Sequence, residues 1–264
     1  MNGKIKKLYE RATSGDVLAQ NELGVMHSRN GDIEDAIHWY TTAALQGLPE
    51  AQLNIAKFYL YGLGVEQDAE KALEWLHKSA EQEFAIANHN LGHIYVEGEC
   101  GIEQNFEKAF HFYSKAAEQG CVDSFYSIAV MYEQGECVEQ SDTEAHKWYL
   151  KAAESGIANA QYAVASQYAC GRGVDMNVVE AFKWCQKAAN QGLPEAQYNL
   201  GLLLLGNDPE IRPNKKQAIK LFEKSAAQGF ALAEEELEKL LKRNTSTGWG
   251  RKLWYISVKF LSKR

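Results

Sequence analysis

Residues 47–83 read GLPEAQLNIAKFYLYGLGVEQDAEKALEWLHKSAEQE, and this stretch decides the fold because its pattern recurs along the chain. The opening Gly-Leu-Pro-Glu-Ala-Gln returns at residues 192–197. The residue that closes each copy recurs at steps of 32 to 37 residues, at Gly15, Gly47, Glu83, Gly120, Gly156, Gly192 and Gly229. A nearly fixed period in this range predicts a solenoid, in which each unit buries its apolar face against its neighbours.

Each copy contains two segments with the apolar spacing of a helix. The first segment carries an aliphatic residue followed by a small one, in Leu23-Gly24, Ile55-Ala56, Leu91-Gly92, Ile128-Ala129, Val164-Ala165 and Leu200-Gly201. The second carries Ala and, three residues later, a large residue, in Ala36/Trp39, Ala72/Trp75, Ala109/Phe112, Ala145/Trp148, Ala181/Trp184 and Ala218/Leu221. These spacings place the large residues on one stripe of each helix, so we expect them in the core.

Turn residues lie where two helices per copy would need them. Pro49 and Pro194 follow a closing Gly by two residues and suit the first turn of a helix. Gly-x-Gly-Val at residues 62–65 and 171–174 would end one helix in the left-handed conformation and reverse the chain. No strand pattern precedes these glycines, so they indicate turns rather than a phosphate-binding loop.

The recurring pattern Ala-x-x-Leu-Gly-x-x-Tyr, Gly-x-Gly-Val and Ala-x-x-Trp-Tyr-x-Lys-Ala-Ala-x-x-Gly resembles the Sel1-like repeat, a branch of the tetratricopeptide superfamily. The resemblance implies an all-α fold, a right-handed α-solenoid of six helix-turn-helix repeats plus a terminal capping helix. Its repeats would span residues 15–243, between an N-terminal capping helix in residues 1–14 and a foreign tail in residues 244–264. The first copy departs with a short turn, and the sixth departs with a polar loop at residues 206–213, either a contact or an irregular turn.

Charge is unevenly distributed along the chain. The net charge of the 264 residues is −7, but residues 248–264 carry five Lys and Arg and no acid, which leaves −12 for the rest. An acidic body disfavours nucleic acid, which needs a basic footprint. It suits a basic or neutral protein partner.

Cysteine usage and the chain termini indicate a compartment. Five Cys, an odd number without close pairs, favour a reducing environment. Cys100 and Cys137 occupy equivalent loop positions in successive copies, too far apart for a disulfide. The N-terminus has no apolar core of a secretory signal, and no stretch is long enough to span a bilayer. We therefore expect a cytoplasmic protein.

Motifs of catalysis are absent from the sequence, and we expect neither an enzyme nor a cofactor. One cluster resembles a site: His89, His93 and Glu97 follow one another at steps of four residues. Two imidazoles one helical turn apart can share a metal ion, with Glu as a third ligand. A metal-binding or enzymatic protein using His89 and His93 is therefore the alternative to a polar spot on a peptide-binding face.

The resemblance also implies where a partner would bind. In tetratricopeptide-like solenoids the first helices of the repeats line a concave surface. The family's groove positions fall on a row rich in Tyr, a residue type enriched at interfaces. We take as candidates Leu53, Lys57, His89, His93, Tyr126, Glu133, Tyr162 and Tyr198. Some of these side chains would instead pack against the adjacent first helix.

The predicted function is a non-catalytic scaffold or adaptor that binds another protein or peptide along this face. Family members in bacteria serve as adaptors, regulators or immunity proteins that block a toxin, so the resemblance implies one of these roles. The tail at 244–264 is basic and aromatic. It would fold back on the last repeat, contact a membrane as an amphipathic segment, or bind a partner, and membrane contact is not the favoured reading.

Overall fold

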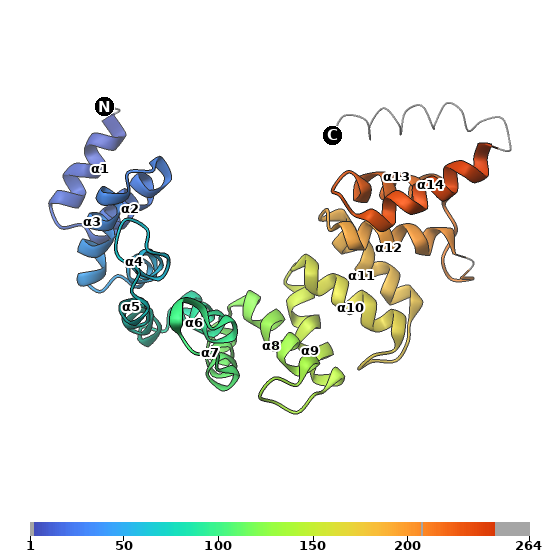
Figure 1. The fold of residues 1–264 in the computed structure, drawn as a ribbon, viewed down its shortest axis with the longest axis horizontal. Helices are drawn as coiled ribbons and strands as arrows, with labels where there is room; N and C mark the ends of the chain where they lie inside the picture. Colours follow the sequence, from blue (N-terminus) through green and yellow to red (C-terminus); the bar gives the residue numbers. More distant parts are fainter. Residues whose placement is uncertain (1–2, 207, 246–264) are drawn as a thin grey trace. The chain divides into compact units, whose positions relative to one another are not determined.

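The computed structural model describes residues 3–206 and 208–245, and within them the fold is all-α (Figure 1). Apart from one short 3-10 turn at Glu99–Gly101, the regular elements of this part are α-helices. Their bounds are α1 Gly3–Thr13, α2 Val17–Asn30, α3 Ile33–Leu45, α4 Pro49–Tyr61, α5 Ala69–Glu81, α6 Ala85–Glu97, α7 Phe106–Glu118, α8 Val122–Gln134, α9 Asp142–Glu154, α10 Ala158–Cys170, α11 Val178–Asn190, α12 Pro194–Leu205, α13 Lys215–Ala226 and α14 Ala231–Thr245.

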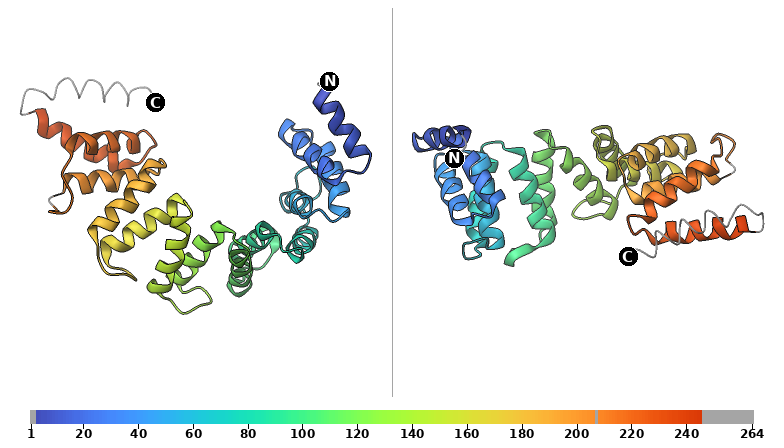
Figure 2. Two further views of the ribbon diagram at one scale, coloured as in Figure 1. Left: turned by 180° about the vertical axis from the view of Figure 1, so that it is seen from behind. Right: turned by 90° about the horizontal axis from the view of Figure 1, so that it is seen from above.

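The helices form two compact units, divided between Ser141 and Asp142. In the first unit each helix from α1 to α7 packs against the next along the chain. In the second unit the same holds from α9 to α14 (Figure 2). Packing of each helix on its successor is the contact pattern of a solenoid, so the predicted α-solenoid is confirmed. We call α2, α4, α6, α8, α10 and α12 the first helices of the repeats, and α3, α5, α7, α9, α11 and α13 the second helices.

The helix boundaries follow the predicted turn residues. Pro49 and Pro194 are the first residues of α4 and α12. Side chains of Asp or Asn accept a hydrogen bond from a backbone N–H in the first turn of a helix at Asp16, Asp68, Asn105, Asn177 and Asn214. Left-handed glycines end five helices, at Gly31, Gly62, Gly98, Gly135 and Gly171. In the irregular sixth copy Gly206 is not left-handed, and Ile211 of the following loop is buried.

Two cysteines occupy turn positions that favour glycine. In the Gly-x-Gly-Val turns, the second glycines Gly64 and Gly173 have φ of 71°. Cys100 and Cys137 stand at the equivalent places and have φ of 56° and 58°. A residue with a Cβ atom is strained in this conformation. All five cysteines are free, which agrees with the expectation that Cys100 and Cys137 form no disulfide.

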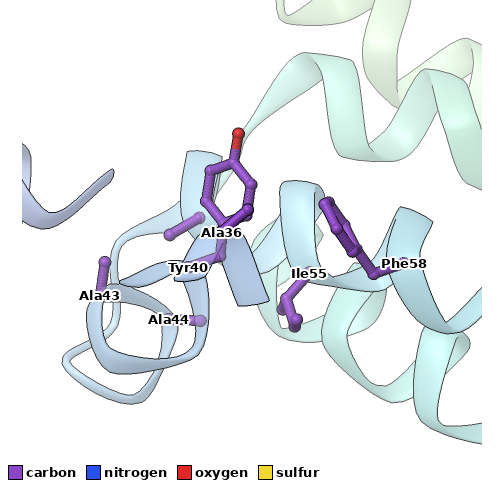
Figure 3. Close-up of a cluster of buried hydrophobic side chains, with 7 residues drawn as sticks. Ala36, Tyr40, Ala43, Ala44, Ile55 and Phe58 are labelled. Atoms are coloured by element: carbon purple, nitrogen blue, oxygen red, sulfur yellow. The ribbon is translucent and has the colours of Figure 1, made fainter. Parts of the chain in front are cut away.

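In α3 the most buried large side chain follows the large residue that the sequence pattern selects. Tyr40, one residue after Trp39, is 4% exposed and packs edge-on against Phe58 of the next repeat, with 5.7 Å between ring centroids (Figure 3). Of the tryptophans expected in the core, Trp184 is buried, whereas Trp75 and Trp148 are half-buried. The pattern therefore found the correct stripe but not its most buried large residue.

A hydrogen-bonded pair of glutamines recurs in the repeats. One Gln lies in the first helix and contacts the end of the preceding helix, and the other follows the second helix. Gln52 is buried; its Nε2 donates to the carbonyl of Ala44 at 3.2 Å, and its Oε1 accepts from Gln82 Nε2 at 2.8 Å. The arrangement gives a second donor to a carbonyl in the last turn of a helix, which also accepts from the backbone N–H of Gly47 at 3.0 Å. The same pairs join Gln20 to Gln46, Gln161 to Gln191, and Gln197 to Gln228.

The two ends of the described chain concern the predicted N-terminal cap and the predicted C-terminal tail. α1 falls within the predicted N-terminal cap, and α14 runs to Thr245. Most of the predicted tail, residues 246–264, lies outside the described residues, so its role stays a prediction. None of the described helices is both long and apolar enough to cross a membrane.

Candidate functional site

The candidate site is a row of side chains on the first helices. On each first helix, three positions spaced by four and then three residues lie on the same side. We call this surface the first-helix face. In the first unit it comprises Asn21, Val25, Ser28, Leu53, Lys57, Leu60, His89, His93, Val96, Tyr126, Val130 and Glu133, and in the second Tyr162, Ser166, Ala169, Tyr198, Leu202 and Leu205.

Side chains at the first of the three positions join neighbouring first helices. Tyr162 on α10 accepts a hydrogen bond through its hydroxyl from Asn199 Nδ2 on α12 at 2.7 Å. His89 Nδ1 on α6 lies 2.9 Å from Ser124 Oγ on α8. The residues chosen from the sequence as partner contacts therefore also hold the repeats together, as the alternative interpretation expected for some of them.

The tyrosines of the first-helix face are half-buried rather than free. Burial raises the pKa of Tyr126, and the carboxylate of Glu133 raises it further. Burial likewise raises the pKa of Tyr162, with smaller contributions from Cys185 and Glu195. Tyr198 packs between two rings, with centroid distances of 5.7 Å to Phe222 and 5.4 Å to Phe230. The three rings are therefore partly packed, and part of the surface of each is left for contact.

The second of the three positions is more open to solvent. Lys57 and His93 are exposed, and Leu202 is 38% exposed. Leu53, at the first position of α4, is only 6% exposed, contrary to its selection as a contact residue. An apolar side chain between stacked helices buries fully, whereas the polar His89 keeps part of its ring accessible. We therefore leave Leu53 out of the candidate surface.

The structure places the two histidines of the possible metal site in different environments. The His89 ring packs against Tyr113 at a centroid distance of 5.3 Å, and its burial lowers its pKa, as does the neighbouring His93. His93 and Glu97 are exposed. Within residues 3–206 and 208–245, no three His, Cys, Asp or Glu side chains are grouped so that they could hold a metal ion. The histidines thus acquire no third ligand there.

A polar chain that sequence reasoning missed links the first three helices. The hydroxyl of Tyr9 on α1 lies 2.6 Å from Nε2 of His27, and Nδ1 of His27 lies 3.2 Å from the carboxylate of Asp32, just before α3. His27 is buried. Because a carboxylate only accepts, Nδ1 donates to Asp32; in the neutral imidazole, Nε2 then accepts from Tyr9. The signal was His27 itself, which stands where most repeats carry Tyr.

A second buried polar pair lies between α9 and α10. His146 Nδ1 and Gln167 Oε1 are 2.9 Å apart, and the His146 ring meets Tyr168 edge-on. Gln167 is fully buried, and its Nε2 has no hydrogen-bond partner. Other repeats have an apolar residue at the position of Gln167. The pair makes this helix contact more specific than an apolar one but leaves one polar atom unsatisfied.

The repeats match a known family over most of the chain. The model of the Sel1 repeat matches residues 17–48, 49–84, 85–121, 125–157, 158–193 and 194–230. The chain belongs to the Sel1 repeat family. The matched segments agree with the helix pairs of the structure, so the resemblance seen in the sequence is confirmed.

Similar proteins come from several sources. A putative sel1-like repeat-containing protein L21 of Acanthamoeba polyphaga mimivirus is 34% identical over 92 residues, which are 33% of this chain and 16% of that protein. The crystal structure of a Sel1 repeat protein from Oxalobacter formigenes has a TM-score of 0.73 at 28% identity, over 80% of this chain and 87% of that one. The structure of c5321, a protective antigen of uropathogenic Escherichia coli strains, has a TM-score of 0.62 at 30% identity, over 90% of this chain and 60% of that one.

Proposed function

We propose that this Sel1 repeat protein is a non-catalytic scaffold or adaptor that binds another protein through the first-helix face. The observation that carries the proposal is that the first-helix face of each unit combines exposed side chains with half-buried aromatic ones. In the first unit Lys57 and His93 are exposed and Tyr126 is half-buried, and in the second unit Leu202 is exposed and Tyr162 is half-buried. Rigid aromatic side chains flanked by charged groups are typical of protein interfaces.

Within this surface the side chains would have separate roles. Tyr126 and Tyr162 would supply contact area at a small entropic cost, because neighbouring groups already restrain their rings. Lys57, His93 and Glu133 would orient the partner by charge and hydrogen bonding. Part of the binding energy would therefore come from side chains that also stabilise the stack.

Composition supports the proposed compartment and the proposed class of partner. A role as an adaptor, a regulator or a toxin-blocking immunity protein would use the same surface. Five free thiols fit the reducing cytoplasm. The net charge of −7 favours a basic or neutral protein as partner over nucleic acid.

Site-specific photo-crosslinking in the native cell tests the proposal. A photoreactive amino acid would replace Lys57 or His93 on the first-helix face, and Lys220 or His111 on second helices as matched controls, because all four side chains are exposed. We expect a discrete crosslinked protein from the first pair and none from the controls. Crosslinks from the control positions alone would move the binding surface to the second helices.

A further inference from the structure

The first helix of the chain is in register with the second helices of the repeats. The carbonyl of Ala12 in α1 accepts from Gln20 at 3.0 Å, just as the carbonyl of Ala44 in α3 accepts from Gln52. With these two alanines aligned, Lys4, Leu8 and Arg11 fall on the positions of Ala36, Tyr40 and Ala43. α1 therefore takes the place of a second helix.

Inner second helices of the first unit lie between two first helices. α3 packs against α2 and α4, and α5 packs against α4 and α6. α1 packs against α2, and no described helix takes the place of a first helix on its other side. No described helix packs on the face of α1 that would meet such a helix, nor on the adjoining face of α2.

These two faces line a groove of about 580 Å³. Its floor is apolar and is formed by Ile5 and Leu8 of α1 with Val25 and Met26 of α2. Ile5 and Leu8 are three residues apart and so lie on one side of α1, whereas Val25 and Met26 are consecutive residues of α2. A groove between two helices with an apolar floor fits the apolar stripe of a third helix.

The rim of the groove is basic although the chain as a whole is acidic. Lys4, Lys7, Arg11 and Arg29 line it with one acid, Glu22, which gives a local charge of +3 in a chain of −7. All four basic side chains of the rim are exposed. Arg11 forms an ion pair with Asp16 at 2.6 Å. In α3 the equivalents of Lys4 and Arg11 are fully buried alanines that meet a helix of the same chain. A helix that binds in the groove would therefore have to present carboxylates to this basic rim.

We propose that this groove binds an acidic amphipathic helix of a partner protein, which packs against α1 as α4 packs against α3. Its apolar stripe packs on Ile5, Leu8 and Val25, and its carboxylates face the basic rim. The groove shares Val25 with the first-helix face, so the two form one continuous surface at this end of the first unit. The inference deepens the proposed function, because it states the chemistry of one segment of the partner.

Fluorescence anisotropy with synthetic peptides tests the inference on the full chain. The probe is a labelled helical peptide of about 16 residues made of Leu, Ala and Glu, with Leu at helical spacing. Its controls are a scrambled peptide of identical composition and a version with Lys in place of Glu. We expect the acidic amphipathic peptide to bind at least about tenfold more tightly than either control.

Two triple variants locate the binding site. Lys4→Glu with Lys7→Glu and Arg29→Glu reverses the rim, and we expect it to weaken binding about tenfold or more. Lys216→Glu with Lys220→Glu and Lys224→Glu makes the same change in net charge on exposed residues of α13, and should leave affinity within about twofold. Ile5→Ser tests the floor and should weaken binding with circular dichroism unchanged.

Specific outcomes would overturn the inference. Equal binding of the scrambled peptide, equal loss in both triple variants, or no binding would mean that the cations only keep this end soluble. A concentration-dependent dimer that the rim variant abolishes would show that the occupant is a second copy of this chain. Crosslinking from His93 is independent of these results, so the proposed function can stand if the inference fails.

Discussion

The ring of Tyr40 occupies the space that a side chain on Gly24 would need: a Cβ atom placed on Gly24 would lie 2.6 Å from Cδ1 of Tyr40. The same relationship joins Gly92 to Tyr113 and Gly201 to Phe222. Where the first helix carries Ala within one unit, at Ala56 and Ala165, the equivalent residue of the second helix is the smaller Leu76 or Cys185. The fourth repeat, whose helices lie in different units, carries Ala129 and Tyr149.

Gly92→Ala should therefore destabilise the protein. Ala normally stabilises a helix relative to Gly, by about 1 kcal/mol. Here the added methyl group would meet the Tyr113 ring, and overpacking of this kind costs about 1–3 kcal/mol. Urea denaturation measures the free energy of unfolding. Tyr113→Leu in the same chain should restore part of the loss, because the second repeat combines Ala56 with Leu76. A stabilised single variant would contradict the proposed packing.

Cys137→Gly should stabilise the protein. The φ of 58° at Cys137 costs an L-residue about 1–2 kcal/mol, which Gly avoids, although Gly also gains entropy in the unfolded chain. We expect a net gain of about 0.5–1 kcal/mol in urea denaturation. Cys170→Gly is the control, because Cys170 is exposed and ends α10, where Gly brings no relief of strain. A gain of the same size in the control would point to loss of a thiol rather than relief of strain.

The sequence sufficed for those parts of the fold that depend on local rules. Pro49 at a helix start and Gly62 at a helix end are properties of one or two residues, and they were predicted correctly. The apolar stripe follows from the helical period. The burial of Tyr40 rather than Trp39 could not be predicted, because it depends on the absence of a side chain at Gly24, sixteen positions away.

The candidate site was harder to predict from the sequence, because it too depends on contacts between residues far apart in the chain. Repeat alignment selects the positions of the first-helix face, but the burial of each side chain depends on the next repeat. Tyr162 is held by Asn199, and Leu53 is buried, although both occupy the same repeat position. The basic groove required the register of α1 against α3, which the short N-terminal segment does not reveal.

Acid should destabilise the protein through His89. Burial lowers the pKa of His89 below its ordinary value of 6.5, so below pH 6.5 the unfolded chain binds more protons than the folded one. Stability is then constant above this pH and decreases as the pH falls through it, by at most about 1.4 kcal/mol per pH unit for one proton. His77, whose pKa burial also lowers, contributes in the same direction.

The variant His89→Tyr isolates this contribution. It introduces the residue that the fourth, fifth and sixth repeats carry at Tyr126, Tyr162 and Tyr198, and it removes the titrating group. Thermal melts between about pH 5 and 8 should show a shallower acid dependence than in the wild type. His93→Tyr is the control because His93 is exposed. An unchanged acid slope in His89→Tyr would show that His89 does not carry the effect.

Zinc should leave the stability of the protein unchanged. His89 Nδ1 is engaged with Ser124, and a tightly bound structural metal would add its binding energy to folding. We expect the melting temperature to be the same with added zinc and with a chelator. A zinc-dependent rise in melting temperature that His93→Ala abolishes would instead support the metal-binding alternative.

Removal of one glutamine from a buried pair should weaken the junction between repeats. Gln52→Leu removes the acceptor of the Gln82 amide and one of two donors to the carbonyl of Ala44, which still accepts from the backbone N–H of Gly47 at 3.0 Å, so we expect a loss of about 1 kcal/mol. Gln82→Ala alone should cost less, because Gln82 is exposed and water can replace it at Gln52. In a double-mutant cycle measured by urea denaturation, Gln82→Ala should add almost nothing once Gln52 is Leu, since their hydrogen bond is already lost. Strictly additive losses would show that the two glutamines stabilise their helices independently.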